Sequence, residues 1–440
     1  MNIQKFFDLA KARGIEESQI QIGKSSSLSI RLFHHEIDSY KVSSSQSIVA
    51  CGIYNGRFGS ATTQKLTPDV FEYLVEQIII AATYSEKPNE IGIFKGSEKY
   101  HKRNLFNAEL GQIPVEKKLA LLREIENDIY AADPRITDAD GVSYSESESV
   151  SEFYNSYGLK LRQRSNHYAF VAGAVAREGE ETKTYYDFFF DNDFSKFNKA
   201  EFVKGIVQSA LKKFGGQPCV SGKYPTVLHH DVASSLIGYF LSSTIADEVQ
   251  RGSSMLKGKL GQRIASRKLT IEEKPLAKTL FYSYFDDEGV ATQNKVIVKN
   301  GVLQTFVYNR ETAKKDGVES TGNASWGGSR IMTGFSQVFV KPGKQSFDEM
   351  IADIHEGVFI TEIAGLETGM NERSGDFSCQ AEGYMIRDGK IAEPLNLITL
   401  SGNLLKMLMD LKAFDNEAKL DEGGTSIANM YIKSMSIGGK

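Results

Sequence analysis

The spacing of apolar positions predicts runs of strands and runs of helices rather than a regular alternation of the two. Helical spacing over residues 2–13 is followed by alternating strand patterns. Asn55-Gly56 is a pair typical of a two-residue hairpin turn. A helix is predicted over 70–84, where Thr67-Pro68-Asp69 provides a start signal. The strands predicted in this part of the chain lie at 27–33, 47–54 and 58–61.

The middle of the chain shows one helix, then a series of short strand patterns. The helix is predicted over 115–131, and a second helix over 199–213 follows the strands. Successive strands without intervening helices indicate an antiparallel meander. Gly215-Gly216-Gln217-Pro218 is typical of a domain boundary, which we place near residue 220. The predicted strands lie at 141–145, 150–154, 159–163, 169–176 and 184–190.

The C-terminal half repeats this mixture, with a helix at 230–250, another at 402–411 and a final strand near 426–437. Asn300-Gly301 and Asp388-Gly389 predict two more hairpin turns. The remaining strands are predicted at 281–284, 295–299 and 302–308. Segregated strands and helices indicate an α+β fold. We expect an N-terminal α+β region over 1–220, with subparts of about 1–105 and 106–220, and a C-terminal domain over 221–440 built on a mixed or antiparallel sheet.

Composition and charge narrow the class of function. The 440 residues carry a formal net charge of −4 and a pI of about 6.1, which argue against nucleic acid or an anionic membrane as a partner. The three cysteines are scattered, which favours a reducing compartment. The N-terminus lacks the pattern of a signal peptide, and the apolar stretches are too short to cross a bilayer. We therefore expect a cytoplasmic protein.

His230 and Asp231 open the apolar helix at 230–250 and are the first candidates for chemistry. An imidazole and a carboxylate can hold a divalent metal and activate its water. Asp231 can equally cap the helix and stabilise the positive end of its dipole, which is our preferred interpretation. Ser235, one turn beyond Asp231, is not a zinc ligand. Further ligands through space could come from three residues, Asp247, Glu248 and His355.

Other catalytic patterns are weak. Ser325 lies in a glycine-rich segment that misses the spacing of a nucleophile elbow by one residue. The same segment holds the only tryptophan, Trp326, which suits a binding or packing loop. Gly23-Lys24-Ser25 fails the phosphate-loop pattern because the earlier glycine is Ser18. Cys379 shows no activating neighbour and is interpreted as a buried thiol.

Several short motifs, in a fixed order, resemble those of the TldD/PmbA family, also described as modulators of DNA gyrase. The likeness runs through nearly the whole chain and is greatest to the PmbA, or TldE, branch. The motifs that carry it are 53–61 (IYNGRFGSA), 132–135 (ADPR), 287–293 (DEGVATQ), 299–303 (KNGVL), 320–324 (STGNA), 374–378 (SGDFS) and 382–384 (EGY).

The resemblance implies a zinc site in the TldD-type subunit, made by His-Glu-x-x-x-His and a cysteine near the C-terminus. In this chain His230 falls on the first histidine, Asp231 on the glutamate and Ser235 on the second histidine. The cysteine is expected near 423–426, but none follows Cys379. Two of three ligands are thus missing, and the remaining residues cannot build a tetrahedral zinc site. We expect no metal or other cofactor here, with zinc only in a TldD-type partner.

The function that the resemblance implies is that of a PmbA/TldE-type subunit. It would pair with a TldD-type subunit, or with itself as a dimer, in a metallopeptidase complex that acts on unfolded or modified peptides. The loops at 322–328 and 365–375 are predicted to line the substrate cavity. Two alternatives stay open: an autonomous homodimeric hydrolase with an atypical site at His230 and Asp231, and a gyrase-modulating factor that binds protein. The predicted substrate-binding residues are Asn323, Ser325, Trp326 and Gly327.

Overall fold

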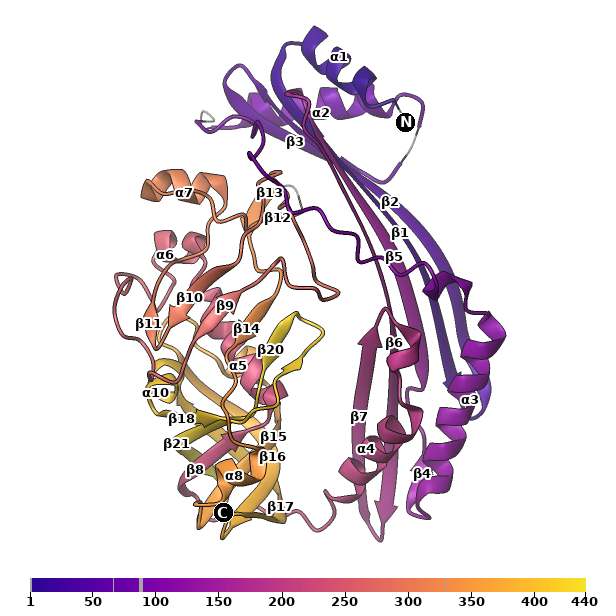
Figure 1. The fold of residues 1–440 in the computed structure, drawn as a ribbon, viewed down its shortest axis with the longest axis vertical. Helices are drawn as coiled ribbons and strands as arrows, with labels where there is room; N and C mark the ends of the chain where they lie inside the picture. Colours follow the sequence, from indigo (N-terminus) through magenta and orange to yellow (C-terminus); the bar gives the residue numbers. More distant parts are fainter. Residues whose placement is uncertain (1, 66, 87–89, 329) are drawn as a thin grey trace. The chain divides into compact units, whose positions relative to one another are not determined.

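The computed structural model describes residues 2–65, 67–86, 90–328 and 330–440, and the chain divides into two compact units (Figure 1). The first unit includes two segments from the C-terminal half of the chain. These units describe packing, so the predicted domain boundary near residue 220 stays a prediction. The first unit contains Met1–Ala210, Lys278–Thr292 and Asn309–Met332, and the second contains Leu211–Ala277, Gln293–Tyr308 and Thr333–Lys440.

The first unit is built on a seven-stranded sheet in the order β3-β2-β1-β5-β6-β4, with β7 also beside β6. Its strand pairs are antiparallel, and β1 pairs with β5, which joins the two predicted N-terminal subparts in one sheet. The strands are β1 (Ile15–Phe33), β2 (Glu36–Tyr54), β3 (Arg57–Thr63), β4 (Ile136–Asp138), β5 (Ser143–Asn155), β6 (Lys160–Glu178) and β7 (Glu181–Asp191).

Helices pack on this sheet through apolar side chains. Ile20, Ile48 and Ile78 are fully buried in one core, where the first two helices meet the sheet. A short two-stranded sheet is formed by β12 (Ala324–Gly327) and β13 (Arg330–Thr333), whose last residue is the first of a segment of the second unit. The helices are α1 (Gln4–Ala12), α2 (Val70–Tyr84), α3 (Val115–Ala132), α4 (Lys199–Leu211), which ends at the boundary of the units, and α7 (Arg310–Asp316), with 3-10 turns at Leu110–Gln112 and Phe194–Lys196.

The second unit contains two six-stranded sheets, ordered β17-β16-β15-β8-β21-β18 and β11-β10-β9-β14-β20-β19. Each has one parallel pair among antiparallel ones, β15 with β8 and β14 with β20, so both sheets are mixed. The first sheet consists of β8 (Gly222–Leu228), β15 (Glu356–Ala364), β16 (Asp376–Arg387), β17 (Lys390–Asn403), β18 (Leu411–Phe414) and β21 (Met430–Gly438). The second consists of β9 (Ile271–Glu273), β10 (Lys295–Lys299), β11 (Val302–Leu303), β14 (Val338–Val340), β19 (Lys419–Leu420) and β20 (Thr425–Ile427).

Separate helices and mostly antiparallel strands confirm the predicted α+β class. The helices of the second unit are α5 (His230–Ser242), α6 (Ala246–Arg251), α8 (Phe347–Ile351), α9 (Leu366–Gly369) and α10 (Leu404–Met409). The predicted helix at 230–250 is therefore interrupted. Thr244 Oγ1 donates a 2.7 Å hydrogen bond to the Leu241 carbonyl, and Ile245 is extended, with φ −73° and ψ 125°. A hydroxyl that bonds its own helix backbone competes with the regular ladder.

The predicted strand at 281–284 is wrong, because Phe281 to Tyr284 follow an irregular path. The predicted strand at 426–437 divides into β20 and β21, with Ala428 and Asn429 between them. All three predicted hairpin turns are confirmed. Asn55 and Gly56 have φ values of 49° and 69°, the left-handed conformation that such turns require. No helix in the described part of the chain combines the length and the apolar character needed to cross a membrane.

Candidate functional site

The candidate site lies where β8 ends and α5 begins. The His229 amide donates a 2.9 Å hydrogen bond to the Ile360 carbonyl of β15, which fixes the path of the chain into the helix. The first backbone N–H groups of a helix have no partner within the helix. One of them, the His230 amide, donates a 2.9 Å hydrogen bond to the side-chain oxygen of Asn429. Asn429 in turn donates to Asp415 at 2.6 Å, and Asp415 is buried at 1% exposure. The start of α5 is thus held from two other segments.

Asp231 lies in the first turn of α5, one position beyond the start of the helix. The residue in the cap position is His229, whose side chain makes no capping hydrogen bond. The prediction that Asp231 is the capping residue is therefore wrong, whereas its carboxylate does lie in the first turn, near the positive end of the helix dipole. Asn429, from beyond β20, supplies the oxygen that a cap would provide. The carboxylate of Asp231 is left free for the two histidines.

His229, His230 and Asp231 form a compact cluster. The Nδ1 atom of His230 lies 2.8 Å from Asp231 Oδ1, and that of His229 lies 3.1 Å from Oδ2. The two imidazole centroids are 3.9 Å apart. Burial alone would raise the pKa of Asp231, but the close contacts with His229 and His230 outweigh it and hold the pKa well below its ordinary value. Asp231 is therefore a carboxylate at neutral pH, with its side chain 55% exposed.

The next turn of α5 offers no further metal ligand. Ser235 Oγ donates a 2.9 Å hydrogen bond to the backbone oxygen of Asp231. Ser234 Oγ donates to the carboxylate of Asp421, which also accepts a 2.8 Å bond from the Thr425 amide. The segment 421–425 thus lies against α5, where the family resemblance places the zinc-binding cysteine. A serine–aspartate hydrogen bond connects the two segments.

These residues do not fit the zinc site that the resemblance implies for a TldD-type subunit. That site needs two histidines and a cysteine, but Ser235 stands at the place of the second histidine and no cysteine lies in the segment 421–425. Of the three implied ligands only His230 is present. Among the described residues, His229, His230 and Asp231 are the only group of three or more metal-binding side chains close enough to share an ion. The prediction of no bound metal stays a prediction.

The three residues proposed as ligands through space are engaged elsewhere. Asp247 accepts a 2.7 Å hydrogen bond from Thr333, and Glu248 forms an ion pair with Arg251. His355 is exposed and lies 3.3 Å from Asp388. None of these three residues belongs to the group of His229, His230 and Asp231.

The predicted substrate-binding residues lie on and beside β12 in the first unit. Trp326 packs against Cys51, Ile53 and Ile93, and its indole N–H donates a 3.2 Å hydrogen bond to Gln21. Asn323 is buried, whereas Ser325 and Gly327 are exposed. Trp326 is thus a packing residue in part, and the substrate-binding role of the four residues stays a prediction.

Cys379 shows the buried position that the sequence indicates. Its side chain is 5% exposed, and its Sγ lies 3.7 Å from the Leu400 carbonyl. Burial raises the pKa of the Cys379 thiol to about 11, which keeps it protonated. A nucleophilic role is not supported by this environment.

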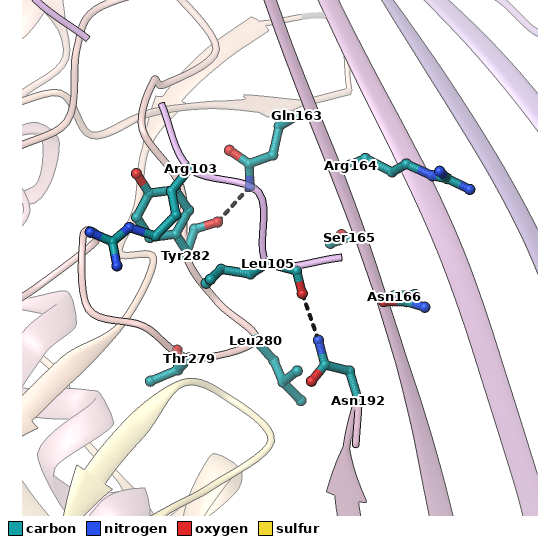
Figure 2. Close-up of a pocket in the computed structure, with 10 residues that line it drawn as sticks. All are labelled: Arg103, Leu105, Gln163, Arg164, Ser165, Asn166, Asn192, Thr279, Leu280 and Tyr282. Atoms are coloured by element: carbon teal, nitrogen blue, oxygen red, sulfur yellow. Dashed lines mark hydrogen bonds between the residues drawn. The ribbon is translucent and has the colours of Figure 1, made fainter. Parts of the chain in front are cut away.

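Sequence analysis missed a polar hollow beside β6 in the first unit (Figure 2). Gln163 donates a hydrogen bond to the Tyr282 carbonyl, and Asn192 donates a 2.8 Å bond to the Leu105 carbonyl. A wider hollow of about 400 Å³ shares Arg103, Gln163 and Arg164 with it. No sequence motif indicated this site, because its lining comes from segments far apart in the chain. The wider hollow is lined by Lys102, Arg103, Asn104, Arg162, Gln163, Arg164 and Tyr284.

Two family models match the chain. Residues 108–214 match the PmbA/TldA metallopeptidase central domain, and residues 221–439 match the PmbA/TldA metallopeptidase C-terminal domain. The α+β fold and the site at the start of α5 thus lie within a known class of metallopeptidase-like proteins. The chain belongs to the PmbA/TldD metallopeptidase family, as its motifs predict.

Individual relatives agree with this assignment. The chain is 24% identical over 426 residues to the metalloprotease PmbA of Escherichia coli, covering 96% of this chain and 92% of that protein. It is 31% identical over 332 residues to a metalloprotease of Methanothermobacter thermautotrophicus, covering 71% of this chain and 73% of that protein.

Two solved structures share the fold over nearly the whole chain. One, from Thermotoga maritima, is described as a candidate modulator of a DNA gyrase; it is 28% identical, with a TM-score of 0.90 and coverage of 99% of this chain and 98% of that one. The other is TldE from Thermococcus kodakarensis, at 22% identity and a TM-score of 0.90, covering 99% of this chain and all of that one. This second likeness shows the fold alone.

Proposed function

We propose that this chain is the PmbA/TldE-type subunit of a two-subunit metallopeptidase and carries no catalytic zinc of its own. One observation supports this most directly. A TldD-type subunit is expected to hold zinc at the start of α5. Here the Ser235 hydroxyl donates a hydrogen bond to the backbone oxygen of Asp231, and the Ser234 hydroxyl donates one to the carboxylate of Asp421. Ser235 stands where the second histidine is expected, and no cysteine follows Cys379, so an imidazole and a thiolate, which are usual ligands of zinc, are both missing.

The partner and substrate belong to the same proposal. A TldD-type subunit supplies the metal, and unfolded or modified peptides are cleaved at its site. This chain closes the chamber and holds the peptide backbone, with the loops at 322–328 and 365–375 as its predicted contacts. Three scattered cysteines, two of them buried, suit the reducing cytoplasm as its location.

The proposal is tested by reconstitution. Cleavage of an unstructured peptide is measured for this chain alone, for a TldD-type subunit from the same organism alone, and for their mixture. We expect cleavage only in the mixture, and co-elution of the two subunits in size-exclusion chromatography. The His230→Ala variant of this chain is expected to support the same rate as the wild type in that mixture. Cleavage by this chain alone contradicts the proposal.

One feature favours the alternative of an autonomous hydrolase. The imidazoles of His229 and His230 both contact the carboxylate of Asp231. A carboxylate that orients an imidazole is the arrangement of a general base. This alternative predicts that the isolated chain cleaves peptides and that His230→Ala abolishes the cleavage. The gyrase-directed alternative rests on the descriptions given to the family and to structures such as the one from Thermotoga maritima, and not on a feature of this site.

A further inference from the structure

The outer edge of β6 is open at residues 162–164. On one side β6 pairs with β5 along this stretch, but β7 joins its other side only from Tyr168 onward. The Tyr284 hydroxyl fills part of the gap: it accepts a 3.0 Å hydrogen bond from the Arg162 amide and donates a 2.7 Å bond to the Arg162 carbonyl. A single side chain therefore replaces a strand beside Arg162.

The backbone of Arg164 faces the same edge without such a partner. In an antiparallel pair, residues two apart direct their amide and carbonyl groups to the same side of the strand. Arg162 directs both groups outward, to Tyr284, so Arg164 directs its own outward as well. No hydrogen bond joins them to any residue that the structure describes. An unpaired amide at a sheet edge is a ready donor for a ligand.

The wider hollow beside this edge carries an excess of positive charge. Arg162 forms an ion pair with Glu152 at 3.4 Å, and Arg164 forms one with Glu148 at 2.6 Å, so the charges of these two arginines are neutralised. The other two cations that line the hollow, Lys102 and Arg103, form no ion pair with any described residue. Both are exposed. The hollow therefore combines an open backbone donor with two uncompensated cations.

We propose that this hollow, the β6 hollow, binds the carboxylate of an aspartate or glutamate side chain in an extended peptide. The Arg164 amide donates a hydrogen bond to the carboxylate, and Lys102 and Arg103, which line the same hollow, add positive charge. An unpaired backbone N–H at a sheet edge with cations nearby favours an anion. The choice of a peptide rests on the proposed function; the choice of an anion rests on the hollow itself.

Nucleic acid is a poorer match for the same charges. Binding of single strands uses exposed aromatic rings for base stacking. The rings near the hollow are covered, since Tyr282 and Tyr284 are 6% and 2% exposed and Arg164 lies 3.5 Å over the Phe106 ring. Glu148 and Glu152 also place negative charge beside the arginines, which opposes a chain of phosphates more than a single carboxylate.

The test measures binding of a fluorescein-labelled hexapeptide of alternating glutamate and serine by fluorescence anisotropy, beside the same peptide with glutamine in place of glutamate. The wild-type chain is expected to bind the glutamate peptide at least about tenfold more tightly than the glutamine peptide. This is the difference in affinity expected when one charge-assisted hydrogen bond is lost. The double variant Lys102→Ala, Arg103→Ala is expected to lose this preference. The matched control is Lys11→Ala, Arg13→Ala, which removes two exposed cations from the same unit and keeps it.

Three results would overturn the proposal. These are equal binding of the two peptides, an unchanged preference in the Lys102→Ala, Arg103→Ala variant, and tighter binding of a single-stranded oligonucleotide than of the glutamate peptide at physiological salt. The assay uses this chain alone, without a partner subunit or metal. A chain that prefers glutamate but cleaves peptides by itself would overturn the proposed function and leave the β6 hollow standing.

Discussion

Ser234 on α5 donates a hydrogen bond to the carboxylate of Asp421, which lies 187 residues further along the chain. The same carboxylate accepts a bond from the Thr425 amide and so shapes the turn at 421–425. Helix and turn are thereby held together at the position where the family resemblance places zinc ligands.

The first prediction concerns Asp421. Its replacement by alanine leaves the Ser234 hydroxyl and the Thr425 amide without their acceptor, so Asp421→Ala is expected to lower the free energy of unfolding by about 1–2 kcal/mol. Urea unfolding followed by circular dichroism measures the change. The exposed neighbour Glu422 provides the control, and Glu422→Ala is expected to change stability by less than about 0.5 kcal/mol. Equal effects of the two variants would contradict this role.

The second prediction concerns Asn429, which connects the start of α5 to the buried Asp415. Asn429→Ala removes the acceptor of the His230 amide and one donor to Asp415. We expect a loss of about 1–3 kcal/mol, because a buried carboxylate loses a hydrogen bond and a helix loses its cap. Urea unfolding measures it, with Lys433→Ala on the neighbouring β21 as the control. A stability equal to that of the control would rule out the connection.

The third prediction concerns pH. Burial raises the pKa of Glu288 to about 7, against the opposing effects of the Arg310 amide and charge. In the unfolded chain the pKa of Glu288 has its ordinary value of 4.5. Between these two pKa values the carboxyl group is protonated in the folded chain and ionised in the unfolded chain. Stability therefore falls as pH rises from about 4.5 to about 7. A glutamine at position 288 does not ionise, so the Glu288→Gln variant does not lose stability in this way. The free energy of unfolding of the variant, relative to the wild type, is expected to increase as the pH rises through that range.

This third prediction is measured by urea unfolding of both proteins at several pH values. Asp286, whose pKa is also raised by burial and by the charge of Glu288, contributes a slope of the same sign. A stability difference between Glu288→Gln and wild type that does not change with pH would contradict the buried, proton-holding carboxyl group.

The fourth prediction concerns the order of cysteine reactivity. Cys51 and Cys379 are buried at 1% and 5% exposure, and burial raises the pKa of both thiols. Burial raises the pKa of Cys219 as well, but its side chain is only partly buried, so the order rests on accessibility. Because alkylation requires an accessible thiolate, Cys219 is expected to react first with iodoacetamide in the folded protein. Mass spectrometry of the labelled peptides measures the order, and labelling of Cys379 at the same rate would contradict it.

The local signals of the sequence predicted turns and element types well. Asn55-Gly56 predicted its hairpin because few residues adopt the left-handed conformation without strain. Strand lengths were less predictable. Most of the pattern at 141–145 and all of that at 150–154 belong to one strand, β5, which begins at Ser143 and whose intervening residues are polar on both faces. Backbone pairing continues through such a stretch, although the apolar periodicity that marks a strand is lost.

The candidate site was predictable only in part. His230 and Asp231 are adjacent and open an apolar helix, so the sequence indicated them directly. The partners that hold them do not appear in any local pattern, since Asn429 lies 199 residues from His230. The same holds for Tyr284, which binds the Arg162 backbone from 122 residues away. Such pairs depend on the tertiary fold, which spacing along the chain does not encode.

The most direct test of the central claim is the zinc content of this chain. The protein is purified with its native N-terminus, dialysed against a mild chelator and measured by plasma mass spectrometry, with a TldD-type subunit treated in the same way. The account predicts about one zinc for each TldD-type subunit and far less than one for this chain. A full equivalent of zinc retained by this chain, and lost in the His230→Ala variant, would contradict it.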